Sequence, residues 1–345
     1  MKWLKRIAGV LAIALVVLVA YAASTVRRSE HPVGFQVVQV QAATGPLAVA
    51  VWYPTSGKPL PTTFVGGSLL DVARDGAVAG NHLPVVVVSH GNGGSALSHV
   101  DLAMALASAG YVVAAPTHAG DNFADQVRQA SPALFNQRAG ELRATLDYLL
   151  ADWAGGSRIA PDRVAAYGMS AGAFTVLTLV GGVPRMARIA THCRAAPEFI
   201  CTALAQARSP LLAGAEGAGT FAADPRIKAA IVVAPGLGFT FAEGGLSGVQ
   251  VPVQVWSGDR DENVPFATNT RIVQDGLGEH AEPHVVAGAT HLSFLAPCGL
   301  LRPPGLCTDT AGFEREAAHV AMNAEVRRFL DAHLRTESPA AAGVP

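Results

Sequence analysis

The sequence predicts an α/β protein whose central, mostly parallel sheet carries helices on both faces. Short apolar runs alternate with stretches of helical periodicity along most of the chain. One run, residues 84–89 (PVVVVS), is almost entirely valine, as expected of a strand buried on both faces of a parallel sheet. Half of the 345 residues are hydrophobic, so the chain can bury a large core.

The expected elements alternate regularly. Strands are expected at residues 35–41, 47–53, 84–89, 111–115, 163–167, 228–234, 252–256 and 283–286. Helices are expected where apolar residues recur at helical spacing, at residues 99–109, 132–151, 171–180 and 313–334. A turn at residues 44–46 should join the first two strands, and Gly110 should cap the first helix.

Two segments rich in Gly and Ala carry no periodicity, and we expect irregular connections there, at residues 55–83 and 181–224. The second is interpreted as a small cap insertion at about residues 181–225. The tail at residues 336–345 is expected to be disordered, which leaves residues 33–335 as one domain.

The N-terminus has the pattern of an export signal. Basic residues precede an apolar run at residues 8–24, and Ala20 and Ala22 are the small residues that a signal peptidase reads. Residues 1–22 are therefore expected to be a signal peptide. The alternative is an uncleaved membrane anchor, because the run approaches the ~20 residues that span a bilayer.

Composition excludes two classes of protein. Charged residues make up 15% of the chain, the formal net charge is -1, and there is no run of Lys or Arg, which argues against a polybasic nucleic-acid binder. The hydrophobic share of 50% excludes a disordered chain, because such a chain cannot bury enough apolar surface to fold.

Four cysteines fit an oxidising compartment. They allow three connectivities, and we expect the two local disulfides, Cys193–Cys201 and Cys298–Cys307. The alternative is a metal site, but neither pair has Cys-x-x-Cys or interleaved His spacing.

The sharpest motif is Gly168-Met169-Ser170-Ala171-Gly172, which lies between an expected strand and an expected helix. This is the context of a nucleophile elbow, where a serine occupies a strained turn and small neighbours let the strand and helix approach. Ser170 is therefore the candidate nucleophile. The alternative is a plain Gly-Ser turn.

A serine nucleophile needs a base, and the base needs a carboxylate to orient it. His291 follows the last expected strand and is the candidate base, although it could be a surface-loop histidine. Asp259, Asp261 and Glu262 follow the strand at residues 252–256. Asp261 is favoured and Asp259 is next. The order serine, acid, histidine is that of α/β-hydrolases.

Backbone donors are needed for the developing oxyanion. We expect one from the N–H of Ala171 and the other from Asn92, in the Gly-rich loop at residues 90–94 (HGNGG). A phosphate-binding loop is the alternative, but neither G-x-x-x-x-G-K-[ST] nor G-x-G-x-x-G is present. His90 is expected to be structural, packed under the elbow.

Three segments resemble platelet-activating-factor acetylhydrolases and the related dienelactone-hydrolase-like proteins: residues 51–54 (VWYP), 84–94 (PVVVVSHGNGG) and 106–118 (LASAGYVVAAPTH). With the elbow, acid and base, the resemblance covers roughly residues 51–295. It implies the α/β-hydrolase fold and the same triad, with Asn92 as an oxyanion donor. The elbow departs from the family at Met169 and Ala171, so acyl preference does not carry over.

The residues and the resemblance together predict an exported serine hydrolase that cleaves short-chain, lipid-type or polyester carboxylic esters through an acyl-enzyme. It is expected in the periplasm or outside the cell. No metal or organic cofactor and no nucleic-acid partner are expected, and any membrane attachment should be through the N-terminal segment only. The alternatives are an amidase or peptidase on the same triad, and a catalytically silent binding protein.

Overall fold

The computed structural model describes residues 2–64, 67–217 and 219–335, and it confirms the mixed α/β fold. Its described residues form a ten-stranded sheet in the order β10-β9-β8-β7-β5-β6-β2-β1-β4-β3. The strands are β1 (Val33–Ala42), β2 (Gly45–Pro54), β3 (Leu60–Thr63), β4 (Leu69–Arg74), β5 (Leu83–Ser89), β6 (Val112–Pro116), β7 (Ile159–Met169), β8 (Ile227–Val233), β9 (Val253–Gly258) and β10 (Ala281–Val286).

The larger part of the sheet is parallel, from β6 through β5, β7, β8 and β9 to β10. β2 runs antiparallel to both β6 and β1, and β4 and β3 extend the far edge. Because parallel strands end at the same edge, the loops that follow β5, β7, β9 and β10 meet there. The candidate residues of the sequence analysis lie on these loops.

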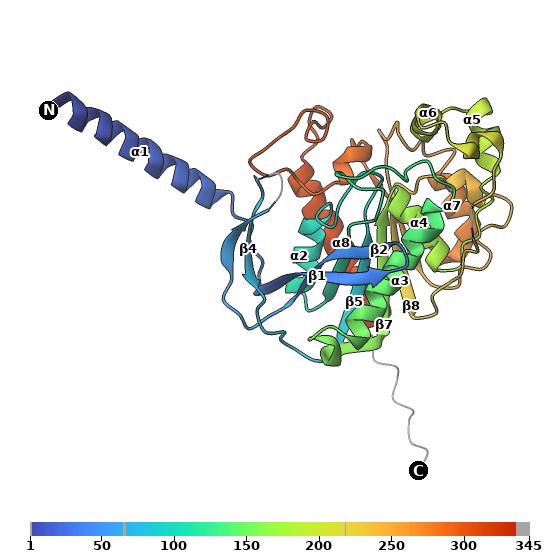
Figure 1. The fold of residues 1–345 in the computed structure, drawn as a ribbon, viewed down its shortest axis with the longest axis horizontal. Coiled ribbons are helices and arrows are strands. Elements are labelled where there is room, and N and C mark those ends of the chain that lie inside the picture. The colour runs from blue at the N-terminus through green and yellow to red at the C-terminus, as the bar shows by residue number, and fades with distance from the viewer. Residues whose placement is uncertain (1, 65–66, 218, 336–345) are drawn as a thin grey trace, which may run out of the picture.

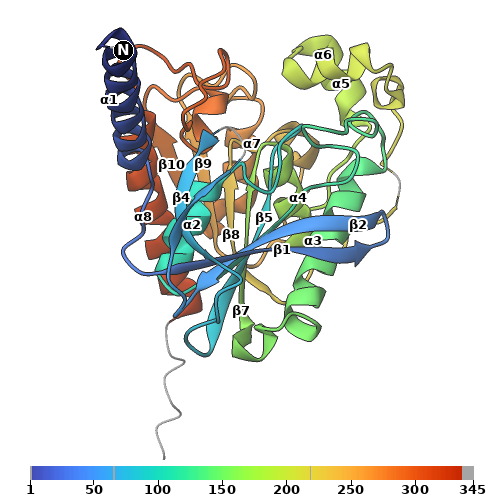
Figure 2. The ribbon, with the colours of Figure 1, turned by 60° about the vertical axis from the view of Figure 1, so that its left-hand side comes forward.

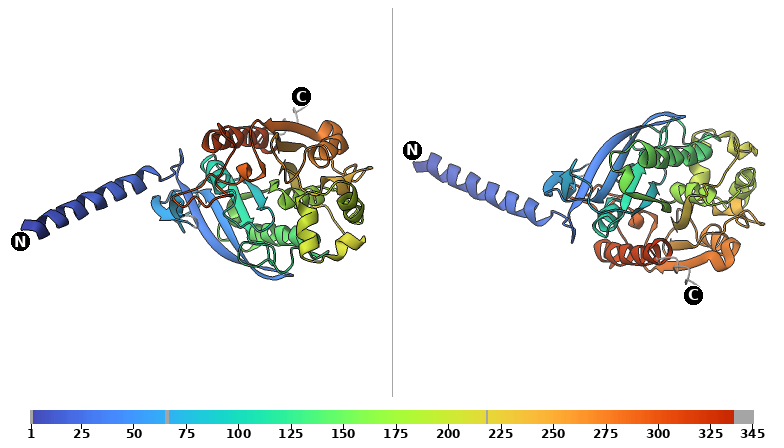
Figure 3. Two further views of the ribbon diagram at one scale, coloured as in Figure 1. Left: turned by 90° about the horizontal axis from the view of Figure 1, so that it is seen from above. Right: turned by 90° about the horizontal axis from the view of Figure 1, so that it is seen from below.

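Helices cover both faces of the sheet (Figure 1). The α-helices of the described residues are α1 (Lys2–Ser24), α2 (Val100–Ser108), α3 (Leu134–Ala151), α4 (Ala171–Leu179), α5 (Arg188–Ala195), α6 (Phe199–Gln206), α7 (Thr270–Leu277) and α8 (Arg315–Leu334). α3, α4 and α7 share one hydrophobic core with the sheet, and α2 and α8 share the other. Figure 3 shows α8 (dark red) and α3 (green) on opposite sides of the sheet.

The position of β5 between two hydrophobic cores explains why its sequence is a continuous valine run. Val85 and Val87 point into the core under α3 and α4, whereas Val86 and Val88 point into the core under α2 and α8. Successive side chains of a strand alternate between faces, so a strand with a core on each side needs an apolar residue at every position. The prediction of a doubly buried strand is confirmed.

The expectation of an irregular connection at residues 55–83 is wrong. β3 and β4 pair antiparallel there and extend the sheet beyond β1. β3 is a short, largely exposed edge strand that contains Pro61, and edge strands need no hydrophobic alternation and tolerate proline. The pattern used to recognise strands is therefore absent from it.

The expectation of irregular chain at residues 181–224 is also wrong in part. The segment contains α5 and α6, which lie together beyond one end of the sheet in Figure 2. Both helices are eight residues long, which is too short for a clear amphipathic period. α7, also eight residues long, went unpredicted. The turn between β1 and β2 lies at residues 43–44, because Ala42 already pairs with Gly45.

The N-terminal helix α1 projects away from the body (Figures 1 and 3). Among the described residues, one helix is long and apolar enough to cross a membrane, Lys5–Ser24, and none of that span is buried. Disulfides join Cys193 to Cys201 and Cys298 to Cys307. The tail at residues 336–345, expected to be disordered, lies outside the described residues.

Candidate active site

Ser170 occupies the sharp turn between β7 and α4, with φ of 56° and ψ of -119°. A non-glycine residue at positive φ is strained and is held there by its surroundings. A Cβ at Gly168 would lie 2.2 Å from the Gly172 carbonyl oxygen, and one at Gly172 would lie 2.0 Å from the Ser89 carbonyl oxygen. Both glycines are therefore required for the close approach of strand and helix.

The loop after β10 brings His291 to this serine. The Oγ of Ser170 lies 3.0 Å from Nε2 of His291, and Nδ1 of the same ring lies 2.7 Å from Oδ2 of Asp261. Since a carboxylate only accepts hydrogen bonds, Nδ1–H donates to Asp261 and Nε2 faces the hydroxyl as acceptor. The three candidates from the sequence analysis thus form one hydrogen-bonded chain.

Asp261 is fixed by its own loop. Its Oδ1 accepts hydrogen bonds from the N–H groups of Asn263 at 3.0 Å and Val264 at 2.9 Å, which leaves Oδ2 for the imidazole. The sequence left Asp259 open as an alternative acid. Its Oδ1 instead accepts from the Gly288 N–H at 2.7 Å, so Asp259 holds the loop before His291 and makes no contact with the ring itself.

The backbone amides of Asn92 and Ala171 lie on the two loops that meet at Ser170, and neither donates to an acceptor among the described residues. The loop at residues 90–94 packs directly on the elbow, because a Cβ at Gly91 would lie 3.5 Å from Cβ of Ser170. Free N–H groups beside a nucleophile can stabilise an oxyanion. Both amides are those that the sequence analysis selected.

A cavity of about 640 Å³ opens onto this chain of side chains. Ser170, His291 and Asn92 line it, and most of the remaining wall is apolar, including Phe64, Phe123, Phe199, Leu292, Leu295 and Leu306. Phe199 comes from α6, so the insertion between α4 and β8 contributes to the wall. Within the described parts of the chain, no group of three or more His, Cys, Asp or Glu side chains could hold a metal ion.

Comparisons with known proteins support the same fold. Residues 41–139 match the family model described as platelet-activating factor acetylhydrolase, isoform II. A ferulic acid esterase from Streptomyces cinnamoneus has a similar solved structure, with a TM-score of 0.60 and 19% sequence identity over 92% of this chain and 94% of that chain. No curated protein matches the sequence.

The chain has the α/β-hydrolase fold. The resemblance seen in the sequence is confirmed at the level of fold and family model.

The loop that carries His291, called the base loop, is supported by a buried ion pair between His319 and Asp101. His291 begins a short 3₁₀ helix, His291–Phe294, whose Ser293 carbonyl accepts a hydrogen bond from Nε2 of His319 at 2.8 Å. Nδ1 of His319 lies 2.7 Å from Asp101. Burial opposes the charged form of His319, but Asp101 and the Ser293 carbonyl outweigh it and raise the pKa of His319.

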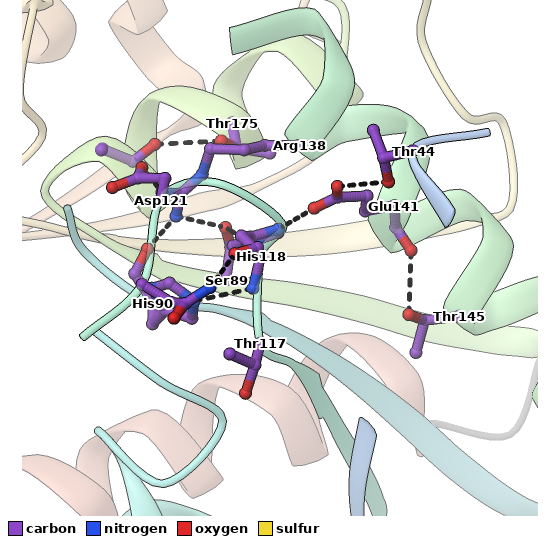
Figure 4. A network of polar contacts seen from close by, with 12 residues as sticks. Thr44, Ser89, His90, Thr117, His118, Asp121, Arg138, Glu141, Thr145 and Thr175 are labelled. Carbon is purple, nitrogen blue, oxygen red and sulfur yellow. Dashed lines mark hydrogen bonds and ion pairs between the residues drawn. The ribbon is translucent and has the colours of Figure 1, made fainter. Parts of the chain in front are cut away.

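Sequence reasoning missed two features of the candidate site. Gly236 follows β8, and a Cβ there would lie 3.6 Å from Oγ of Ser170 and 3.7 Å from the Ala171 nitrogen, so its missing side chain keeps that space open. The second is a buried polar network beneath the loop at residues 90–94, shown in Figure 4. Only His90 was expected there, and it is indeed buried.

Proposed function

We propose that this protein is an exported serine esterase that cleaves carboxylic esters through an acyl-enzyme on Ser170. The observation that carries the proposal is the chain Ser170–His291–Asp261, with contacts of 3.0 Å and 2.7 Å, at the wall of an apolar cavity. A hydroxyl hydrogen-bonded to a correctly oriented imidazole is the recurring requirement for acyl transfer by serine.

The chemistry follows from the donors and acceptors. Nε2 of His291 takes the proton of Ser170 as Oγ attacks the ester carbonyl carbon, and Asp261 stabilises the resulting imidazolium. The amides of Asn92 and Ala171 donate to the oxyanion of the tetrahedral intermediate. The imidazolium then protonates the departing alcohol. A water activated by the same imidazole hydrolyses the acyl-enzyme and restores Ser170.

The cavity wall favours an apolar substrate over a charged one. His291 and Arg74 are the ionisable side chains among its lining residues, and the aromatic and leucine side chains supply most of the surface. The family name, acetylhydrolase, and the neighbour's title, esterase, both denote cleavage of an ester. Short-chain, lipid-type and polyester substrates share the ester group and the low charge that this wall would accept.

Export is supported by the N-terminal helix and by the disulfides. Lys5–Ser24 has the length and apolarity of a signal sequence or anchor, and disulfides persist in oxidising compartments outside the cytosol. We propose that residues 1–22 direct the protein across the membrane and that residues 33–335 form the hydrolase domain, with the cap insertion at about residues 181–225.

A chain-length series of p-nitrophenyl esters tests the proposed activity. Turnover should appear with at least one member and should be lost in Ser170→Ala. Matched p-nitroanilides distinguish an esterase from an amidase, because the leaving group alone differs. Faster anilide than ester hydrolysis would favour the amidase. An absence of turnover with every substrate would favour a binding protein and overturn the proposal.

A further inference from the structure

A fully buried polar network lies beneath the loop at residues 90–94, which we call the oxyanion loop (Figure 4). Its members come from β5, the first position of the oxyanion loop, the loop after β6 and α3. All are at most 1% exposed: Ser89, His90, His118, Asp121, Arg138 and Glu141. Burying charged groups is costly unless each finds a partner. The function proposed above assigns none of these side chains a role.

Arg138 contacts the first residue of the oxyanion loop directly. From α3, its Nη2 donates a hydrogen bond to the His90 carbonyl oxygen and lies 3.2 Å from Oγ of Ser89. Its Nη1 forms a buried ion pair with Oδ2 of Asp121. Within the described residues only its Nε lacks a partner.

Asp121 links Arg138 to the backbone on the C-terminal side of Asn92. Its Oδ1 accepts a hydrogen bond from the Gly93 N–H at 2.9 Å. One guanidinium therefore holds the His90–Gly91 peptide directly, through its carbonyl oxygen, and the Asn92–Gly93 peptide indirectly, through Asp121. The amide of Asn92 lies between these two points and has no partner of its own.

His90 restrains the next peptide, Gly91–Asn92, which carries the donor N–H itself. Its Nε2 accepts from the His118 N–H at 3.0 Å, so its proton is on Nδ1, which donates to the Gly91 carbonyl oxygen at 2.6 Å. Burial, together with the nearby His118 and Arg138, lowers the pKa of His90 well below its ordinary value. The neutral ring keeps this arrangement of one donor and one acceptor.

We propose that Arg138 is a positioning residue that, through His90 and Asp121, aims the Asn92 N–H at the oxyanion. The inference rests on the proposed function, since it assumes acyl transfer at Ser170. An oxyanion donor must lie about 2.7–3.1 Å from the developing charge, and a displacement of about 1 Å can cost about 100-fold in rate. An oxyanion loop held on both sides of Asn92 keeps the donor N–H within this distance range before substrate binds.

The test compares Arg138→Met and Arg138→Lys with wild type in the full chain. Arg138→Met removes every contact, whereas Lys can replace one of them. Rates are expressed per reactive serine, counted by titration with a fluorophosphonate, so that misfolded protein is not scored. We expect kcat to fall by about 100-fold in Arg138→Met with KM nearly unchanged, and by a smaller factor in Arg138→Lys.

A second readout separates positioning from loss of structure. A trifluoromethyl ketone adds to the serine and forms a tetrahedral oxyanion, so its Ki should rise in parallel with the fall in kcat. Thr145→Val is the matched control. Thr145 is buried on the same helix and donates to the Glu141 carbonyl at 2.8 Å, without touching the oxyanion loop. Its kcat and Ki per titrated serine should match wild type.

The double variant Arg138→Met/Asp121→Leu keeps the proposal testable if Arg138→Met does not fold, because replacing a buried ion pair by apolar residues is often tolerated. Its kcat should fall as in Arg138→Met. The proposal is overturned if Arg138→Met or, should that variant not fold, the double variant keeps kcat per titrated serine within threefold of wild type or shows an unchanged Ki. Failure of the proposed function would instead leave wild type itself without turnover or titratable serine.

Discussion

The described residues include two hydrogen-bonded triads of serine, histidine and carboxylate with the same connectivity, one at the cavity and one in the core. In the first, the contacts are 3.0 Å from hydroxyl to imidazole and 2.7 Å from imidazole to carboxylate. In the second they are 2.9 Å and 2.6 Å. The first is Ser170–His291–Asp261 and the second is Ser89–His118–Glu141.

The surroundings of the two serines differ far more than the distances. Ser170 lies at a strained turn, is partly exposed and lines a cavity beside two free amides. Ser89 ends a regular strand, is 0% exposed, and its Oγ lies within hydrogen-bonding distance of a guanidinium nitrogen of Arg138. Hydrogen-bond geometry alone therefore does not identify a nucleophile. Access, backbone strain and nearby free amides distinguish the proposed reactive triad from the buried one.

The electrostatic surroundings of the buried triad also argue against a reactive Ser89. Burial, reinforced by the charge of Arg138, lowers the pKa of His118 well below its ordinary value, and burial raises the pKa of Glu141. Taking a proton from Ser89 would create an imidazolium in a site that opposes positive charge. The buried imidazole is thus suited to holding Ser89 in place and unsuited to acting as a general base.

The largest expected effect separates the two serines. Ser170→Ala should lower kcat by at least about 10⁴-fold, because it removes the nucleophile. Ser89→Ala should keep kcat within about tenfold of wild type, and should cost about 1–3 kcal/mol of stability by leaving the His118 nitrogen unpaired. Ester hydrolysis and urea unfolding of both variants measure the two effects. Equal loss of kcat in both would break the distinction.

The two carboxylates should differ in the same way. Asp261→Asn should lower kcat by about 10⁴-fold, since the amide favours the wrong imidazole tautomer. Glu141→Gln should act on folding instead, and should lower the free energy of unfolding by about 1–3 kcal/mol because an NH₂ group would face a donor in a buried site. A larger fall of kcat per folded molecule in Glu141→Gln than in Asp261→Asn would contradict the assignment.

The smallest expected effect depends on pH and concerns the ion pair between His319 and Asp101, which supports the loop that carries His291. The pKa of His319 is raised, so its stabilisation is full below its ordinary pKa and is lost as pH rises through the raised value. His319→Gln should therefore cost about 2 kcal/mol near pH 6 and clearly less near pH 9. Thermal unfolding at both pH values checks this. A larger cost at the higher pH would contradict the sign.

Acid should weaken the same ion pair from its other member. Burial acts to raise the pKa of Asp101, but His319 and Asn323 outweigh it and hold that pKa well below its usual range. The stabilisation from a carboxylate of lowered pKa is present above its ordinary value and is lost as pH falls through the lowered one. The difference between wild type and His319→Gln should accordingly shrink again in strong acid.

The candidate triad could be predicted from the sequence because each member is placed by a local pattern. The glycines around Ser170 mark the elbow, and Asp261 and His291 each follow an expected strand, in the chain order of one fold. Ser89 and His118 have no such pattern. They lie 29 residues apart and meet only because β5 and β6 are neighbours in the sheet.

The missed elements of the fold have a common physical reason. Hydrophobic periodicity reports burial on one face over several residues, and β3 is a four-residue edge strand with little burial. α5, α6 and α7 are each eight residues long. The doubly buried β5 and the long helices α3 and α8 present enough positions for the pattern to emerge, and they were placed within a few residues.

Active-site labelling tests the central assignment most directly. Native protein is treated with a fluorophosphonate, digested and analysed by mass spectrometry, with a fully unfolded sample as a control for access. The account predicts one adduct, on the peptide that contains Ser170, and none on the peptide that contains Ser89. An adduct on Ser89 in the native protein, or full ester turnover with Ser170 unlabelled, would contradict it.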